Sequence, residues 1–381
     1  IKQGYKQTKV GIIPEDWEDI KIKDIVKVSQ GLQIAIDDRF TTPAHNRVFY
    51  ITIPFIEGKK EEYIENPKSS TLCKKDDILV VRTGSGVGKI IRGVEGAFHN
   101  NFFKVKPSDN INIDFFYYFL TSPRVQFLMA KYAGNSAIPD LNHGDFYSLD
   151  FLIPPLKEQE KIAEILTTWD EAITKQTELL RAKELQKKAL MQKLLSGEVR
   201  FDGFSDKWKE VRIDKLFDFK KGQELSKEKL EKNGIFECIL YGELYTTYSE
   251  VISEIKSKTN IKEGIKSKID DILIPASTTT SAIDLAIAST IQKDNVLIGG
   301  DINILRKKTN NINGEFISKY LTHIKKMEIA KYAQGITIIH LYSKDFKHLK
   351  IQLPSLPEQQ KIAEVLSLAD DEINLLKNEL E

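Results

Sequence analysis

The chain has 381 residues, a length that fits two or three domains, and 41% of them are hydrophobic, which is enough for sizeable cores. Its 56 Lys and Arg residues nearly balance its 55 Asp and Glu residues, which excludes a uniformly basic nucleic-acid coat protein and an acidic tail protein but allows a local basic face. Cys73 and Cys238 lie far apart and no apolar run approaches the roughly 20 residues of a membrane span, so we expect a cytoplasmic protein with neither a disulfide framework nor membrane contact.

An internal repeat covers most of the chain. Residues 131–173 recur at residues 331–373, where 19 of 43 aligned positions are identical. Shorter matches lie upstream in the same order, at 17–31 against 208–222 and at 76–79 against 270–273. A repeat of about 190–200 residues is too long for a solenoid unit and fits a domain with its connector. The sequence therefore predicts a tandem duplication.

Each copy has two parts of different composition. In residues 1–156 and 200–356, short Val/Ile-rich runs bounded by Gly, Pro, Asp and Asn predict strands. The strands that we expect include 78–81, 272–274 and 351–353, with a helix in each copy at 114–120 and 315–321. The second parts, 157–195 and 357–381, are rich in Glu, Lys, Gln, Leu and Ala and start at prolines, which predicts one long helix in each copy.

Both predicted long helices carry an apolar stripe at helical spacing. In the second helix the stripe follows a 4-3-4-3-4 heptad pattern, whereas in the first it is interrupted by polar residues. Because the two stripes are copies, we expect each helix to pack on the other. The predicted helix-pair interface consists of Ile162, Leu166, Ile173, Leu180, Ile362, Leu366, Ile373, Leu376 and Leu380.

No catalytic motif is visible in the sequence. The glycine-rich stretch 83–90 has Thr83 where a phosphate-binding loop needs Gly and Ile90 where it needs Ser or Thr. The acidic pairs at 76–77 and 270–271 precede predicted strands, where turn roles explain them better than acid–base chemistry. We assign neither catalytic nor metal-binding residues, and an enzyme with unrecognised catalytic residues remains an alternative.

Two motifs carry a family resemblance. Ile13-Pro14-Glu15-Asp16-Trp17 lies near the start, and a Pro-Leu-x-Glu-Gln type block opens each predicted long helix, at 153–166 and 353–366. Together with the duplication, these motifs make the chain resemble the specificity subunits of type I restriction–modification enzymes over essentially its full length. One departure is that the second helix stops at Glu381, the position equivalent to Arg181.

The resemblance implies a division into an α+β fold with two similar α/β target-recognition domains, 1–156 and 200–356. Between them, the helices at 157–199 (with a linker) and 357–381 would form an antiparallel coiled-coil spacer. Each domain would bind one half of a split double-stranded DNA sequence. The implied partners are methyltransferase subunits, which we expect to number two, and restriction subunits. S-adenosylmethionine, ATP and Mg²⁺ would belong to those partners, with no cofactor bound by this chain.

Candidate DNA contacts lie where the two copies differ. The shared strand at 76–79 and 270–273 leads into unlike polar tips, and Arg, Lys, Ser and Thr suit base edges or phosphates. The tyrosines of the second domain fit a half-buried core equally well. The first-domain candidates are Arg39, Arg47, Arg82, Thr83, Ser85, Lys89, Arg92, Asn100, Asn101 and Ser136. The second-domain candidates are Tyr241, Tyr245, Thr246, Thr247, Tyr248, Ser277, Thr278, Thr279, Thr280 and Thr337. A helical scaffold or assembly protein without DNA readout is the alternative function.

Overall fold

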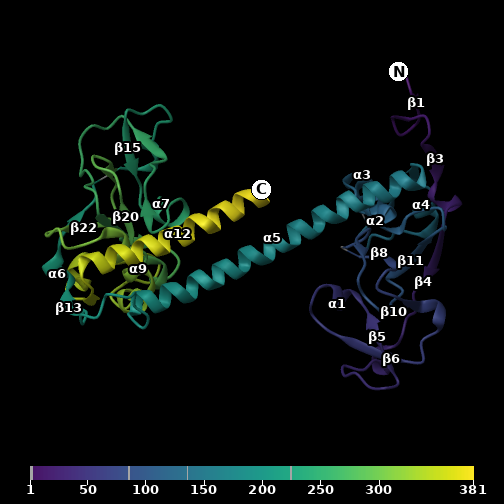
Figure 1. Cartoon of the computed structure of the whole chain (residues 1–381), viewed down its shortest axis with the longest axis horizontal. Coiled ribbons are helices and arrows are strands. Elements are labelled where there is room, and N and C mark those ends of the chain that lie inside the picture. The colour runs from purple at the N-terminus through teal and green to yellow at the C-terminus, as the bar shows by residue number, and fades with distance from the viewer. Residues whose placement is uncertain (1–2, 85, 135, 224) are drawn as a thin grey trace. The chain divides into compact units, whose positions relative to one another are not determined.

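The computed structural model describes residues 3–84, 86–134, 136–223 and 225–381. The chain divides into two compact units, residues 1–174 and 175–381 (Figure 1). The long helix α5 (Leu156–Ser196) contributes its first half to one unit and its second half to the other. Within the described residues, every helix is too short or too polar to span a membrane.

The first unit contains two main sheets. One has the strand order β4-β11-β8-β9 and the other the order β6-β5-β10-β7. Their strands are β4 (Val26–Gln30), β11 (Phe102–Pro107), β8 (Ile78–Val81), β9 (Ile90–Ile91), β6 (Glu62–Glu65), β5 (Arg47–Ile51), β10 (Gly96–Phe98) and β7 (Leu72–Cys73). Short antiparallel pairs join β1 (Tyr5–Gln7) to β2 (Ile12–Pro14) and β3 (Glu18–Lys21) to β12 (Asp150–Ile153). The helices are α1 (Ile53–Ile56), α2 (Ile113–Thr121), α3 (Pro123–Ala133) and α4 (His143–Tyr147).

Strand β8 is buried on both faces, which explains its continuous apolar sequence. Ile78 and Val80 point to the core formed with α2, α3 and α4, whereas Leu79 and Val81 point to the core formed with the second sheet. Successive side chains of a strand point to opposite faces, so an unbroken apolar run is required where both faces are covered. Asn112 caps the start of helix α2, and its side chain accepts hydrogen bonds from two N–H groups of the first turn.

The second unit repeats this plan with its strands distributed differently between the two main sheets. Its main sheet has the order β14-β22-β18-β20-β16, and a smaller sheet has the order β17-β15-β21. The strands are β14 (Phe217–Lys221), β22 (Ile302–Lys307), β18 (Asp271–Pro275), β20 (Ser289–Ile291), β16 (Val251–Ile252), β17 (Ser257–Thr259), β15 (Phe236–Ile239) and β21 (Leu297–Ile298). Pairs are formed by β13 (Lys209–Arg212) with β24 (Lys350–Leu353) and by β19 (Ser277–Thr278) with β23 (Ile339–His340). The helices are α6 (Ile213–Leu216), α7 (Glu243–Thr246), α8 (Ala282–Leu285), α9 (Gly314–His323), α10 (Lys326–Ala330), α11 (Ser343–Phe346) and α12 (Leu356–Leu380).

The duplication predicted from the sequence is confirmed, and the strand register repeats with it. Ile78 of β8 pairs with Val105 of β11, and the equivalent Ile272 of β18 pairs with Leu305 of β22. Ile272 and Ile274 face the helices of the second unit, while Leu273 faces the smaller sheet. The two copies therefore share a core as well as an order of elements.

A repeated glutamine fastens the start of each long helix to its own unit. The buried side chain of Gln159 accepts a hydrogen bond from Asn112 N–H at 2.9 Å and donates one to the Pro154 carbonyl at 2.9 Å. Gln359 is equally buried and accepts from Asn313 N–H at 3.0 Å. Each of these N–H groups lies at the residue that caps α2 or α9. The glutamine of the repeated motif thus satisfies buried backbone groups that would otherwise lack partners.

A second repeated contact lies about three turns further along each long helix. In the first unit, Tyr118 of α2 donates to Asp170 of α5 at 2.8 Å. In the second unit, the buried ammonium of Lys319 of α9 lies 2.9 Å from Asp370 of α12. Lys187 from the second half of α5 pairs with the same Asp370 carboxylate. One aspartate position therefore holds the helix to its unit in both copies, through different partners.

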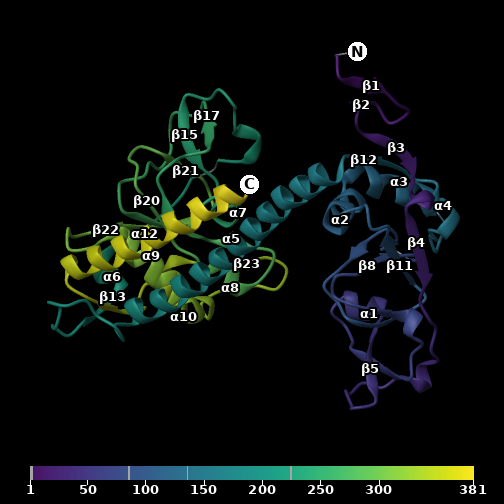
Figure 2. The same ribbon diagram turned by 45° about the vertical axis from the view of Figure 1, so that its right-hand side comes forward.

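Within the second unit, α12 and the second half of α5 pack antiparallel (Figures 1 and 2). Gln176 of α5 hydrogen-bonds to Glu379 of α12, and further along α5 Lys183 pairs with Glu372 at 2.6 Å. Lys187, one turn later, pairs with Asp370, so residue numbers rise along α5 as they fall along α12 and the two helices run in opposite directions. Beneath these ion pairs, an apolar layer is formed by Leu190, Met191, Leu194, Leu195, Ile362, Ala363 and Leu366. The predicted helix pair is thus present in this unit.

The residues predicted for the helix-pair interface differ in their surroundings. Ile362, Leu366 and Ile373 are buried, and Leu180, Leu376 and Leu380 are partly buried. Ile162 packs on the core of the first unit instead, while Leu166 and Ile173 are exposed. The stripe of α5 therefore serves two purposes, because its start contacts the first unit and its end contacts α12.

Candidate nucleic-acid interface

In the first unit, three segments meet where β8 ends. Arg82, which follows β8, donates its backbone N–H to Asn101 O at 2.7 Å, and its carbonyl accepts from Leu141 N–H at 2.9 Å. Thr83 forms an isolated bridge with Asp140. These main-chain bonds fix the start of the glycine-rich stretch beside residues 100–101 and 139–141. The candidates Arg82, Thr83 and Asn101 are thereby brought together.

The guanidinium of Arg82 is oriented by a carboxylate. Its Nε and Nη2 donate to the two oxygens of Asp140 at 2.9 and 3.2 Å, and Nη1 lies 3.5 Å from Gln30 Oε1. The Arg82 and Asp140 side chains are 33% and 40% exposed. The neighbouring His143 ring is partly buried, and this burial, followed by the charge of Arg82, lowers the pKa of the imidazole. At neutral pH the positive charge at this strand end therefore comes from Arg82.

The other first-unit candidates lie in different surroundings. Lys89 and Ser136 are exposed, and Asn100 donates to Gln33 at 3.1 Å. Ser85 lies outside the described residues. Three arginines are engaged by carboxylates on other elements: Arg39 with Glu62 of β6, Arg47 with Glu65 of β6, and Arg92 with Asp114 of α2. Their ion pairs hold them to those elements, so they do not join the cluster around Arg82.

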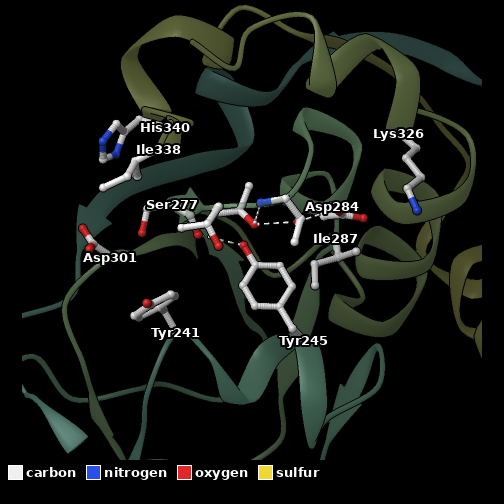
Figure 3. Close-up of a pocket in the computed structure, with 12 residues that line it drawn as sticks. Tyr241, Tyr245, Ser277, Asp284, Ile287, Asp301, Lys326, Ile338 and His340 are labelled. Atoms are coloured by element: carbon white, nitrogen blue, oxygen red, sulfur yellow. Dashed lines mark hydrogen bonds between the residues drawn. The ribbon is translucent and has the colours of Figure 1, made fainter. Parts of the chain in front are cut away.

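In the second unit, the equivalent strand end opens into a cleft of about 760 Å³ (Figure 3). Ala276 follows β18, donates its N–H to Asp301 O at 2.7 Å, and accepts from Leu341 N–H at 2.9 Å. The cleft is lined by Tyr241, Tyr245, Ser277, Thr278, Thr279, Thr280, Asp284, Ile287, Asp301, Lys326, Ile338 and His340. Six candidates predicted for this domain, two tyrosines and four hydroxyl residues, therefore gather in one place.

Tyr245 forms a fixed wall of the cleft. Its hydroxyl donates to the Ser277 carbonyl at 2.9 Å, and burial raises the pKa of the phenol. Asp284 accepts hydrogen bonds from Thr280 and Ser281. These bonds lower the pKa of its carboxyl group, and the bond from Thr280 has the larger effect. The cleft therefore presents a carboxylate together with hydroxyl groups. This mixture suits hydrogen-bonded contact with base edges or sugars.

Four remaining candidates lie away from the lining of the cleft. Thr246 donates to the Gly242 carbonyl at 3.1 Å and also contacts Thr247. The half-buried Tyr248 accepts a hydrogen bond from Lys256 N–H at 2.9 Å. Thr337 is exposed in the hairpin closed by Gln334 and His340.

Sequence reasoning missed the side chains that the fold adds to each strand end. Asp140 and His340 are equivalent in the repeat and differ, although the next residue is Leu in both copies. A position that differs beside one that is identical could have marked Asp140 and His340 as candidate contact residues. Asp284 and Lys326 carried no such signal, because they lie in the short helices α8 and α10 and not at the ends of the shared strands.

The described residues hold no group of three or more His, Cys, Asp or Glu side chains placed to bind a metal ion. Cys73 and Cys238 are both buried free cysteines, and burial raises the pKa of each thiol to about 11. These thiols are therefore inert packing groups at neutral pH.

Comparison with known proteins gives a consistent result. The family model "Type I restriction modification DNA specificity domain" matches residues 14–182 and 205–381. The type I restriction enzyme MjaVIII specificity subunit of Methanocaldococcus jannaschii is 23% identical over 402 residues, covering 100% of this chain and 92% of that protein. The putative MjaX specificity subunit of the same organism is 27% identical over 410 residues, covering 100% and 93%.

Solved structures agree on the fold. The S subunit of a type I restriction–modification system from M. genitalium superposes with a TM-score of 0.58 and 19% identity, covering 96% of this chain and 92% of that one. The HsdS subunit from Thermoanaerobacter tengcongensis superposes with a TM-score of 0.50 and 16% identity over 96% and 92%. With the family model matching both copies of the repeat, the chain belongs to the family of type I restriction–modification DNA specificity subunits.

Proposed function

We propose that this chain recognises a bipartite, asymmetric sequence in double-stranded DNA, with one half-site read by each copy of the duplicated domain. The observation that carries the proposal is the repeated strand end. The same main-chain bonds hold Arg82 beside Asn101 and Ala276 beside Asp301, but the side chains differ. A shared scaffold with unlike polar groups suits two domains that read different bases.

The chain acts without catalysis of its own. Methyltransferase subunits, two per specificity subunit, supply S-adenosylmethionine and the reacting groups, and restriction subunits supply ATP- and Mg²⁺-dependent cleavage. Membership of the specificity-subunit family supports this division of labour. The relatives that match over the full chain are themselves specificity subunits of restriction enzymes.

The paired helices act as a spacer that fixes the distance between half-sites. A helix rises about 1.5 Å per residue, so the 41 residues of α5 extend for roughly 60 Å. The pairing of its second half with α12 stiffens that part against bending. A stiff connector gives one spacing, whereas a flexible linker would permit many.

Reconstitution with the cognate methyltransferase subunits tests the proposal. The complex should methylate two short, different sequences at a fixed separation, as read by methylation mapping of genomic DNA. The chain alone should neither methylate nor cleave DNA. A complex that assembles but binds all duplexes alike would indicate a scaffold without readout. Methylation or cleavage by the isolated chain would indicate an enzyme.

A further inference from the structure

Four positions surround the strand end in each unit, and the fold places them equivalently. The matching hydrogen bonds from residue 82 to 101 and from 276 to 301 define two of them. The third position is the residue that forms a β-bridge with the residue after the first position. Asp140 pairs with Thr83 in this way, and His340 pairs with Ser277. The fourth is the last residue of β4 or β14, each paired with the neighbouring strand. We name these four positions the tip set. It is Gln30, Arg82, Asn101 and Asp140 in the first unit, and Lys221, Ala276, Asp301 and His340 in the second.

In the first unit, Asp140 engages one particular edge of the Arg82 guanidinium. Its two oxygens accept from Nε and Nη2, which form the side edge of the group. The outer edge, formed by Nη1 and Nη2, presents two parallel N–H groups. That fork matches the O6 and N7 acceptors of guanine in the major groove. The partly exposed Asp140 thus limits the rotation of a side chain that is otherwise long and mobile.

In the second unit, the same positions cannot make this contact. Ala276 has no polar side chain, and the ring of His340 stacks on Tyr342 with centroids 5.7 Å apart. Asp301 contributes a carboxylate that lies 3.5 Å from Lys221. Figure 3 shows Asp301, Ser277 and His340 on the same side of the cleft. Carboxylates accept hydrogen bonds and therefore suit the amino groups of cytosine or adenine rather than the acceptor edge of guanine.

From this geometry we propose that Arg82, oriented by Asp140, reads one guanine of the half-site bound by the first domain. Arg82 is the specificity-determining residue and Asp140 is a positioning residue that acts through it. The inference rests on the proposed function and adds the base and the residues. On this proposal, the differences between the two tip sets cause the two domains to recognise different bases.

The test uses the full chain in complex with its methyltransferase and duplexes that carry the mapped target. Replacing each guanine of the first half-site by 7-deazaguanine removes N7. For the wild-type complex, one such replacement should weaken binding roughly 5- to 150-fold, the range expected for a lost bidentate contact. In Arg82→Ala the same replacement should have no further effect. Arg124→Ala is the matched control, because Arg124 lies in the same unit and donates to the Val10 carbonyl.

Asp140→Asn separates positioning from structural support. The variant should still prefer guanine at that one base pair, with a smaller discrimination, and should keep the wild-type melting temperature. Equal weakening of Arg82→Ala on all sequences, with a lower salt dependence, would identify a phosphate contact and overturn the proposal. Unchanged discrimination in Arg82→Ala, or a first half-site without guanine, would also overturn it. Failure of the proposed function would look different, because the wild-type complex would then show no target sequence at all.

Discussion

At the scale of single residues, the side chains that matter most are those whose partners lie far away in the sequence. Arg82 stands out in the sequence because it precedes a glycine-rich stretch. Its partner Asp140 is 58 residues away and becomes visible only when the strand ends converge. Glu62 and Arg39 show the opposite case, because an arginine that suggested DNA contact is held by a nearly buried carboxylate. Sequence patterns identify the polar residues at the strand ends. They do not show which charged side chains form ion pairs with one another.

The buried glutamine at the start of α12 provides a first prediction. Gln359→Ala removes the acceptor of Asn313 N–H and leaves that partly buried donor without this partner. We expect the free energy of unfolding of the second unit to fall by about 1–3 kcal/mol. Denaturant titration of the full chain measures the change. Gln360→Ala is the control, since Gln360 is the next residue and is exposed. Equal effects of the two substitutions would contradict the anchoring role.

Glu250 provides a prediction for pH. A hydrogen bond from His323 lowers the pKa of the Glu250 carboxyl to about 2 in the folded protein, against 4.5 ordinarily. Because the folded pKa is depressed, the stabilisation is complete above pH 4.5 and is lost as the pH falls from 4.5 towards 2. The loss should amount to roughly 3 kcal/mol.

Unfolding free energies measured across pH 2–7 check this expectation. Glu250→Gln should flatten the acid limb of the stability curve, whereas Glu254→Gln should leave it unchanged, because Glu254 is 80% exposed. A wild-type slope that persists in Glu250→Gln would show that other carboxylates cause the acid sensitivity.

At the scale of elements, the long helices could be predicted because composition and prolines mark them directly. They begin at Leu156 and Leu356, one residue before the expected starts. The division of α5 between two units could not be predicted, because the same apolar spacing suits packing on a domain or on a helix. Leu166 and Leu366 occupy equivalent positions, yet only Leu366 is fully buried, through contacts that include the second half of α5.

This division gives a prediction for α12. Ile373 is 6% exposed and lies beside Lys187 and Leu190 of α5, so Ile373→Asp places a carboxylate on the buried side of α12 that faces α5. We expect a loss of roughly 3 kcal/mol or more and, with the helix pair disrupted, loss of assembly with the methyltransferase. Leu375→Asp on the same helix is the control, because Leu375 is 63% exposed. Melting curves and size-exclusion chromatography of the mixed subunits provide the readouts; normal assembly of Ile373→Asp would refute the helix-pair model.

At the scale of the whole molecule, duplication accounts for most of what the sequence could predict. Features that both copies share identify the scaffold. One such feature is the strand register, which is the same for β8 with β11 and for β18 with β22. The readout surface is what they do not share, and a single sequence offers only one comparison for each position. That comparison was enough to locate the tips but not the cleft that Asp284 and Lys326 complete.

An exchange of domains tests the assignment of half-sites. Replacing residues 200–356 by the corresponding domain of a relative should change one half of the methylated sequence and preserve the other half and the spacing. The reason is that α5 and α12 stay unchanged while one tip set is replaced. Methylation mapping of the exchanged complex reports all three features together. A change in both half-sites, or in neither, would contradict a one-domain, one-half-site arrangement.

The paired anchors at the helix starts have a consequence for inheritance. Trp17 bonds to Glu158 and Trp208 to Glu358, so a domain is fastened by a helix turn whose sequence is nearly the same in both copies. A genetic crossover within such a shared stretch joins the incoming domain to a helix that already has the glutamate needed to hold that domain. A single recombination event can therefore replace a whole recognition domain while keeping its contacts with the helix.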